Sequence, residues 1–297
     1  MSSRQAHFRV GISLVLLAVV SALSACSRAP PLGAADYASL HLRKACSAVD
    51  KPGPAGSVDR ITNRYDIRVS VRTPVNYDGT LAHPLLVVFA PGGYHRFASE
   101  DFYGLTRSAT AAGFIIAYPD HLKLSMRAFE ELGHVPALVA GRWCVDSSRI
   151  YFAGHSDGGT TSAALAFLGT PELRPRAVAI SAAGIRRQDL EQYACPPPMS
   201  VLVVHSRIDE LFALPAYGKD PARWWASCNK CQPVPGAVDQ EGCVEYDGCA
   251  PGVRTRYCEV QTPHRQWSVA NAALFAFFAG PTEPPGSSSP HGLAPAR

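Results

Sequence analysis

The segment that decides the fold is 149–167, Arg-Ile-Tyr-Phe-Ala-Gly-His-Ser-Asp-Gly-Gly-Thr-Thr-Ser-Ala-Ala-Leu-Ala-Phe. Its first five residues are mostly apolar and predict a short strand, and residues 160–167 predict a helix of small side chains. Between them, Gly154 and Gly158 flank Ser156 in the pattern Gly-x-Ser-x-Gly, which suits a sharp turn that leaves no room for a Cβ at either glycine. A strand, this turn and a helix form the setting of a nucleophile elbow. The segment therefore predicts Ser156 as a catalytic nucleophile; the alternative is a glycine-rich loop that contains a serine by chance.

Strands and helices are expected to alternate on both sides of this segment. The predicted strands are 65–72, 84–90, 114–118, 177–181, 201–205 and 254–260, and the predicted helices are 101–112, 135–143 and 268–278. Several of these strands are short, continuous apolar runs, which is typical of strands buried on both faces of a parallel sheet. We therefore predict an α/β fold of the α/β-hydrolase kind, with a mainly parallel central sheet flanked by helices. No internal repeat is evident.

A nucleophilic serine needs a histidine that takes its proton and a carboxylate that orients the histidine. In the α/β-hydrolase order both follow the serine and lie just after later strands. Asp209 follows the predicted strand that ends at His205, and His264 follows the one that ends at 260. The sequence thus predicts the triad Ser156, Asp209 and His264. Glu210 is the alternative acid, and the alternative for His264 is a surface histidine.

The oxyanion formed during acyl transfer requires backbone donors at fixed positions. One predicted donor is the N–H of Asp157, the residue after the nucleophile, whose side chain is expected to point away from the triad. The second should come from the loop after the strand 84–90, and we assign it to the N–H of Gly93. The alternative for this loop is a simple turn. His155 is expected to line the carboxyl edge of the sheet, and His205 to support the loop of the acid.

The bulk composition is that of a globular protein. The chain has 297 residues, of which 47% are hydrophobic and 18% charged, so it can bury a sizeable core. Its formal net charge is only +4 and no run of lysine or arginine is present, which argues against a nucleic-acid partner.

The N-terminus has the features of an export signal. Arg4 and Arg9 precede an apolar run over 10–20 that is short for a membrane span, and Leu23-Ser24-Ala25-Cys26 follows. This ending is similar to a bacterial lipobox, in which the cysteine becomes the lipidated first residue of the mature protein. The alternative is an ordinary signal peptide that leaves Cys26 as a free or paired thiol. Ser27 in place of an aspartate resembles the sorting pattern for the outer membrane.

These features give a domain plan. We expect a lipoprotein-type signal peptide at 1–25, a flexible tether at 26–45, a catalytic domain at 46–280 and a disordered tail, rich in Pro, Gly and Ser, at 281–297. The expected location is the bacterial envelope, at the outer membrane or in the periplasm, with membrane contact only through a lipid anchor at Cys26.

Eight further cysteines suit an exported protein with disulfides, although spacing alone does not give their connectivity. Cys228-Asn229-Lys230-Cys231 has the spacing of a redox or zinc motif. A thioredoxin-like site would open a helix directly after a strand, and zinc would need a second close pair, so structural disulfides are favoured. The sequence implies no metal and no organic cofactor.

Several segments resemble the polyhydroxybutyrate depolymerase and feruloyl esterase group of secreted α/β-hydrolases. They are 85–89 with Gly92-Gly93, 145–159, Ala222-Arg223-Trp224-Trp225 with Cys231, Tyr246-Asp247-Gly248-Cys249, and His264-x-x-Trp267. The resemblance spans about residues 65 to 279 and is most specific over 145–159. It implies hydrolysis of hydroxyalkanoate oligomers or of feruloyl or acetyl esters, and it implies a disulfide between Cys231 and Cys249.

The sequence departs from that group at two places. Pro91-Gly92 stands where the group usually has His-Gly, and the segment from Pro263 to Trp267 is one residue longer than its Gly-His-x-Trp. These departures bear on the geometry of the oxyanion loop and on the substrate. No polymer-binding module is seen, so we expect substrates other than crystalline polyester. The prediction is an exported serine carboxylic-ester hydrolase; the alternatives are a non-catalytic envelope lipoprotein on the same fold, or a peptidase or thioesterase with the same triad.

Overall fold

The structure is a computed structural model and describes residues 46, 53–169 and 174–280. The predictions of a signal peptide at 1–25, a lipidated Cys26, a tether at 26–45 and a tail at 281–297 lie outside the described residues. Within the described residues, no helix combines the length and the apolar character that crossing a membrane requires.

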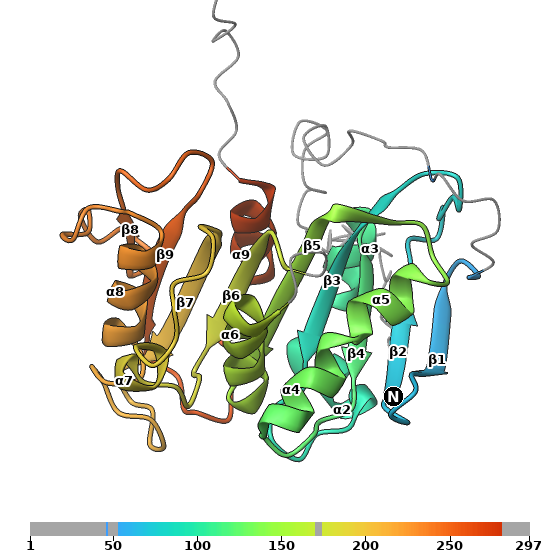
Figure 1. The fold of residues 1–297 in the computed structure, drawn as a ribbon, viewed down its shortest axis with the longest axis horizontal. Helices are drawn as coiled ribbons and strands as arrows, with labels where there is room; N and C mark the ends of the chain where they lie inside the picture. Colours follow the sequence, from blue (N-terminus) through green and yellow to red (C-terminus); the bar gives the residue numbers. More distant parts are fainter. Residues whose placement is uncertain (1–45, 47–52, 170–173, 281–297) are drawn as a thin grey trace, which may run out of the picture. The chain divides into compact units, whose positions relative to one another are not determined.

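A nine-stranded mixed sheet forms the centre of the fold (Figure 1), in the order β1-β2-β4-β3-β5-β6-β7-β9-β8. The strands are β1 (Ser57–Thr62), β2 (Arg68–Arg72), β3 (His83–Phe89), β4 (Ile115–Pro119), β5 (Val145–His155), β6 (Ala177–Ser181), β7 (Ser200–Ser206), β8 (Cys243–Tyr246) and β9 (Thr255–Val260). The six central strands, β4-β3-β5-β6-β7-β9, run parallel to one another. The outer strands β1, β2 and β8 are antiparallel to their neighbours. The predicted α/β fold with a mainly parallel sheet is confirmed.

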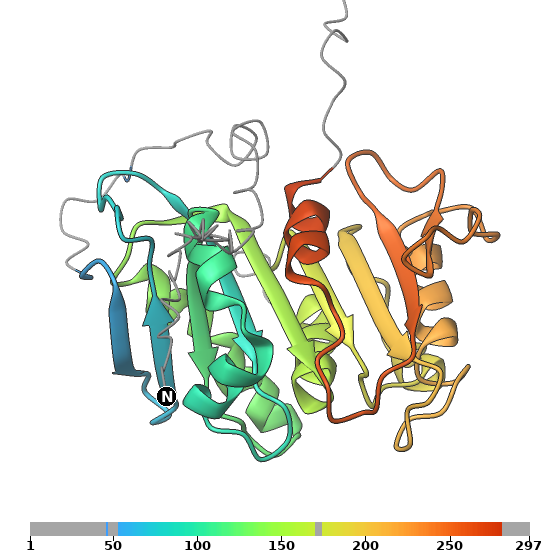
Figure 2. The ribbon, with the colours of Figure 1, turned by 180° about the vertical axis from the view of Figure 1, so that it is seen from behind.

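Helices cover both faces of the sheet. Those on the face seen in Figure 1 are α4 (Met126–Gly133), α5 (Val135–Ala140), α6 (Asp157–Leu168), α7 (Arg187–Leu190) and α8 (Lys219–Cys228). Those on the face seen in Figure 2 are α2 (Arg96–Tyr103), α3 (Thr106–Ala111) and α9 (Asn271–Ala279). Two separate hydrophobic clusters correspond to these two layers.

The alternation of side chains along each strand explains the continuous apolar runs in the sequence. In β3, Leu85, Val87 and Phe89 belong to the cluster under α4–α8, whereas Leu86 and Val88 belong to the cluster under α2, α3 and α9. Successive side chains of a strand point to opposite faces, so a strand covered on both sides must be apolar at every position.

One predicted helix is wrong. The segment 101–112 does not form a single helix: α2 ends at Tyr103 and α3 begins at Thr106. Gly104 separates them because it adopts a left-handed conformation with φ of 59°, and its N–H donates to the carbonyl of Glu100 as a helix cap. The sequence analysis also did not predict β1, β8, α4, α7 or α8.

Four disulfides link the eight cysteines outside the N-terminal segment. The pairs are Cys46–Cys144, Cys195–Cys228, Cys231–Cys249 and Cys243–Cys258. Cys228 and Cys231 therefore bond to different partners and do not form a redox pair with each other. Disulfides of this number are typical of an exported protein.

Candidate active site

Ser156 lies in a sharp turn between β5 and α6. Its backbone has φ of 56° and ψ of −121°, a conformation that a residue with a Cβ rarely adopts. Its N–H donates to the carbonyl of Ser181 at the end of β6, at 3.0 Å, which fixes the turn against the neighbouring strand. Backbone strain of this kind persists only where the surrounding structure enforces it, and it clusters at functional sites.

The glycines around Ser156 are required by close backbone contacts. A Cβ on Gly154 would overlap the carbonyl of Gly158, and a Cβ on Gly158 would overlap the carbonyl of Phe89. Helix α6 thus begins directly against the ends of β5 and β3, and its first turn approaches the sheet more closely than any side chain would allow. The Gly-x-Ser-x-Gly spacing follows from this packing.

The structure brings Ser156, His264 and Asp209 together. His264 Nε2 lies 2.9 Å from Ser156 Oγ, and His264 Nδ1 lies 2.8 Å from Asp209 Oδ2. An ionised carboxylate only accepts hydrogen bonds, so Nδ1 carries the proton and Nε2 accepts from the serine hydroxyl. This is the protonation state in which the imidazole can take the serine proton.

Asp209 is held by backbone donors. Its Oδ1 accepts from the N–H groups of Leu211 and Phe212, at 2.9 and 2.8 Å, which leaves Oδ2 for His264. Burial by itself would raise the pKa of this carboxyl, but the hydrogen bonds from His264, Phe212 and Leu211 outweigh burial and lower it. The carboxyl of Asp209 is therefore ionised at neutral pH. The alternative acid, Glu210, instead accepts from the backbone N–H of His264 at 3.0 Å.

Two further buried histidines contact the loops that carry Asp209 and His264. His155 Nε2 donates to the carbonyl of His264 at 2.5 Å, and its Nδ1 lies 3.0 Å from Ser181 Oγ. Burial lowers the pKa of His155 to about 4, so this ring is neutral at physiological pH. His205 Nε2 lies 2.7 Å from the carbonyl of Phe212, in the loop that carries Asp209, and burial lowers its pKa as well.

Tyr103 ties the nucleophile strand to its neighbour. Its hydroxyl donates to the carbonyl of Phe89 at 2.7 Å and accepts from the N–H of His155 at 2.8 Å. Trp267 packs edge-on against the Tyr103 ring, with 4.9 Å between ring centroids. Trp267, the last residue of the His264-x-x-Trp267 pattern, thus packs against Tyr103, whose hydroxyl binds the backbone N–H of His155 next to Ser156.

The loop after β3 contains a contact that the sequence analysis missed. The N–H of Gly93 donates to His121 Nδ1 at 3.2 Å, and His121 Nε2 lies 2.9 Å from Asp157 Oδ2. A Cβ on Gly92 would lie 3.1 Å from the same Asp157 oxygen, so the loop passes directly by this carboxylate. The one available sequence signal was that His121 comes two residues after a buried parallel strand, β4, at the edge of the sheet where Ser156 lies.

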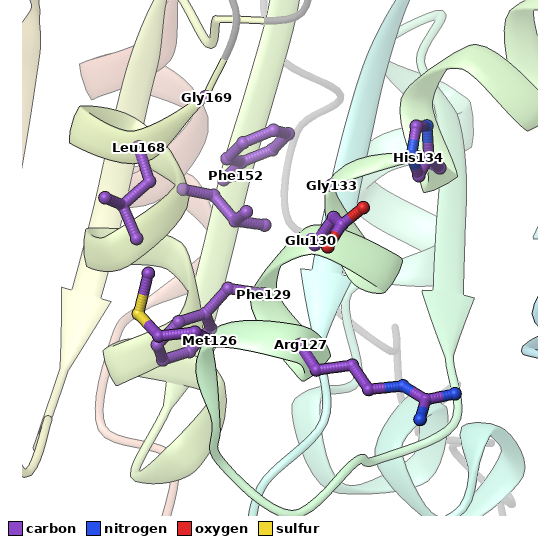
Figure 3. Close-up of a pocket in the computed structure, with 10 residues that line it drawn as sticks. Met126, Arg127, Phe129, Glu130, Gly133, His134, Phe152, Leu168 and Gly169 are labelled. Carbon is purple, nitrogen blue, oxygen red and sulfur yellow. The ribbon is translucent and has the colours of Figure 1, made fainter.

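One cavity among the described residues lies away from these side chains. It has a volume of about 450 Å³ and is bounded by α4, by the C-terminal end of α6 and by Phe152 of β5 (Figure 3). Met126, Phe129, Leu165 and Leu168 give it a mostly apolar wall. None of its ten lining residues belongs to the Ser156–His264–Asp209 group.

Among the residues that the structure describes, one cluster has potential metal ligands, namely Asp239, Glu241 and Cys243. The sulfur of Cys243 is bonded to Cys258, and both carboxylates pair with Arg256, at 2.6 and 2.8 Å. The cluster is therefore an ion-pair group in which one guanidinium offsets part of the charge of two carboxylates, and the sulfur of Cys243 is already bonded.

Comparison with known proteins places this geometry on a known fold. No family model matches the sequence, and a search of curated proteins found no significant match. Among solved structures, an acetyl xylan esterase from Aspergillus awamori has a TM-score of 0.57 at 12% identity, over 76% of this chain and 99% of its own. A putative dipeptidyl aminopeptidase IV from Bacteroides ovatus has a TM-score of 0.50 at 14% identity, over 75% of this chain and 34% of its own.

A third structure, an α/β hydrolase from a Medee basin deep-sea metagenome library, has a TM-score of 0.46 at 18% identity, over 59% of this chain and 79% of its own. Identities this low establish the fold and nothing finer. The fold is that of the α/β-hydrolases.

Proposed function

We propose that this protein is an exported serine hydrolase that cleaves carboxylic esters through an acyl-enzyme. The observation that carries the proposal is the continuous set of contacts from Asp209 through His264 to Ser156, at 2.8 and 2.9 Å, with the serine in a strained turn. A degenerate, non-catalytic protein would have no need to keep this geometry.

In the proposed reaction, Ser156 Oγ attacks the acyl carbon while His264 Nε2 takes the hydroxyl proton. The Asp209 carboxylate stabilises the imidazolium that forms, and His264 then gives the proton to the departing alcohol oxygen. In the second half of the reaction, water attacks the acyl-enzyme while His264 takes its proton; the bond from the acyl carbon to Ser156 Oγ then breaks, His264 returns the proton to Oγ, and the carboxylic acid leaves. The N–H groups of Gly93 and Asp157 bind the oxyanion in both steps.

The chemistry of the surroundings favours an ester with apolar or aromatic groups. Tyr94 and Phe97 are each 37% exposed on the segment after β3, and Ile208 and Leu211 are 54% and 62% exposed beside Asp209. Because these side chains belong to the loops that carry Gly93 and Asp209, we propose that they contact the substrate. The resemblance to polyhydroxybutyrate depolymerases and feruloyl esterases, and the name of the acetyl xylan esterase among the structural neighbours, support hydroxyalkanoate oligomers or feruloyl or acetyl esters as the substrate class.

The proposal includes export and a lipid anchor at Cys26. The four disulfides support an oxidising compartment. Labelling of the full chain with a radioactive fatty acid in a bacterial host tests the anchor, because Cys26→Ser should abolish the label.

The direct test replaces the nucleophile. Ser156→Ala is expected to abolish turnover of p-nitrophenyl acetate and butyrate and to prevent labelling by a fluorophosphonate probe, with the circular-dichroism spectrum unchanged. Ser147→Ala, a change of an exposed serine on β5, is the matched control and should leave both signals intact. Equal turnover in the two variants would reject the proposal. A panel with aryl esters, hydroxyalkanoate oligomers, thioesters and peptides then separates an esterase from a thioesterase or peptidase.

A further inference from the structure

His121 contacts both residues that we propose as oxyanion donors. We infer that His121 is a positioning residue of the oxyanion hole: the Asp157 carboxylate holds its ring, and the ring holds the N–H of Gly93 until the substrate oxyanion takes over that hydrogen bond. This inference rests on the proposed function and adds a residue to it that lies outside the triad.

The two hydrogen bonds of the ring fix its protonation state. The N–H of Gly93 can only donate, so His121 Nδ1 must accept and carries no proton. The proton of the neutral ring is then on Nε2, where it donates to Asp157 Oδ2 at 2.9 Å. The contacts therefore form one directed chain, from the Gly93 N–H through the imidazole to the Asp157 carboxylate.

His121 is itself anchored to the loop that it orients. Its backbone N–H donates to the carbonyl of Tyr94 at 3.1 Å. The preceding residue, Asp120, accepts from the N–H of Arg96 at 2.8 Å and pairs with the side chains of Arg68 and Arg96. The side chains of His121 and Asp157 are 18% and 31% exposed, so the pair lies at the surface of the site, where a substrate can reach it.

The loop needs such an anchor because of its glycines. Gly92 and Gly93 follow one another, and Gly93 has φ of 78° with nothing within 4 Å of the position of a Cβ. Glycine has the largest backbone freedom of all residues. The turn that contains Gly93 is closed by the hydrogen bond from the Tyr94 N–H to the Pro91 carbonyl at 3.1 Å. The hydrogen bond to His121 adds a second restraint, which acts on the direction of the Gly93 N–H itself.

The exchange of acceptors favours the transition state. In the free protein, the Gly93 N–H bonds to a neutral nitrogen at a rather long 3.2 Å. A developing oxyanion is a charged acceptor, and hydrogen bonds to charged acceptors are roughly twice as strong as those between neutral groups. The ester carbonyl of the ground state is uncharged and offers no such gain. The Gly93 N–H therefore changes its acceptor from His121 Nδ1 to the substrate oxygen only as negative charge develops there, and this lowers the barrier to reaction.

His121 also moderates an unfavourable charge. The Asp157 carboxylate lies next to its own backbone N–H, the other proposed donor, and a negative charge there repels an oxyanion. The Nε2–H of His121 donates to this carboxylate and so offsets part of its charge. Without His121, the carboxylate would lose this hydrogen bond.

The test uses three substitutions at His121 in the full chain. The amide oxygen of asparagine takes the place of Nδ1, so His121→Asn retains the acceptor for Gly93. The amide of glutamine reaches the place of Nε2, so His121→Gln retains the donor to Asp157. His121→Ala removes both. We expect kcat for p-nitrophenyl butyrate to fall about 10- to 100-fold in the alanine variant and less in the other two, with KM nearly unchanged, because removing a whole oxyanion donor typically costs about 100- to 1,000-fold.

A trifluoromethyl ketone provides a second readout, because it forms an oxyanion adduct with the serine. Its inhibition constant should rise in proportion to the loss of kcat/KM in each variant, as expected of a transition-state analogue. Asp157→Asn should weaken the effect of His121→Ala in a double-mutant cycle, since the charge that His121 binds is then absent. Additive effects would show that Asp157 does not hold the ring.

His134 supplies the matched control, because its ring contacts Arg64 and Tyr65 and none of the residues of the proposed site. His134→Asn should leave kcat unchanged. The inference is overturned if all three His121 variants keep wild-type kcat and wild-type ketone inhibition while Ser156→Ala is inactive; in that case the proposed function stands. If the wild-type protein neither hydrolyses esters nor reacts with the fluorophosphonate, the proposed function fails and the role of His121 fails with it.

Discussion

At the scale of single residues, the two carboxylates that follow β7 have separate tasks. Asp209 binds the imidazole of His264, and Glu210 binds its backbone N–H. Asp209 is 9% exposed, whereas the Glu210 carboxylate lies at the surface. The sequence favoured Asp209 by its place after the strand and left Glu210 as the alternative, because the direction in which each of two adjacent side chains points depends on the loop that follows.

This separation predicts unequal effects of two similar substitutions. In Asp209→Asn, the amide no longer accepts from His264 Nδ1 and favours the wrong tautomer, so kcat should fall about 1,000-fold or more. In Glu210→Gln, the amide oxygen still accepts from the His264 N–H, so kcat should change little. Initial rates with p-nitrophenyl butyrate at neutral pH measure both. If kcat fell further in Glu210→Gln than in Asp209→Asn, Glu210 rather than Asp209 would be the acid of the proposed triad.

The spacing of the sequence pointed to Ser156, Asp209 and His264 because each follows a strand of recognisable composition. His121 could not be found in this way. Its partners lie 28 and 36 residues away along the chain, and its contacts depend on where the loops after β3 and β4 meet. A histidine two residues beyond a strand has many equivalents in any sequence, and only the folded chain shows which of them meets a carboxylate.

At the scale of elements, the buried parallel strands were predictable and the peripheral elements were not. Strands such as β3 and β6 are apolar except for one polar residue at an end of each, because both faces are covered. By contrast, β1 is mostly exposed and β8 has only four residues, so neither has a clear period of two. The N-cap Ser125, whose hydroxyl accepts from the Ala128 N–H, marked the start of α4 but was not recognised.

The first turn of α6 yields a prediction at this scale. A Cβ on Gly158 would overlap the Phe89 carbonyl and lie 3.0 Å from the Ala90 carbonyl, and both are backbone atoms that cannot rotate away. Gly158→Ala should therefore move α6 away from β3, reduce the free energy of unfolding by roughly 3 kcal/mol, and reduce esterase activity because Ser156 moves with the helix.

Gly252→Ala is a suitable control. Gly252 has φ of 73° but open space around the position of a Cβ, so its replacement brings only backbone strain, of order 1 kcal/mol. Urea unfolding followed by tryptophan fluorescence gives both free energies. If Gly158→Ala were no more destabilising than Gly252→Ala, the close approach of α6 to the sheet would not be the reason for this glycine.

At the scale of the whole molecule, the disulfides divide into two groups. Cys46–Cys144 spans 98 residues and joins the start of the described chain to the segment before β5. The other three lie within residues 195–258, where β7, β8 and β9 carry or flank the loops of Asp209 and His264. An even number of cysteines predicted disulfides but not their partners, because connectivity depends on which strands become neighbours.

The stability of the whole molecule should depend on pH through His155. Its pKa is about 4 in the folded protein because it is buried, against 6.5 for the free side chain. As pH falls from 6.5 to 4, the unfolded chain gains a proton at this site and the folded protein does not, so the free energy of unfolding decreases through this window. The difference between these two pKa values corresponds to at most roughly 3 kcal/mol in the free energy of unfolding. Asp209, with its lowered pKa, adds a further loss only below its ordinary value of 3.8.

Equilibrium unfolding in urea between pH 4 and 7, with the disulfides intact, measures how the free energy of unfolding changes with pH. His155→Gln keeps a donor within reach of the His264 carbonyl but has no group that titrates. Its stability should therefore be lower than that of the wild type at pH 7 and should change less between pH 6.5 and 4. His205, also buried with a lowered pKa, retains its own contribution in both proteins. Parallel slopes for the two proteins would show that His155 is not the group through which acid acts on the fold.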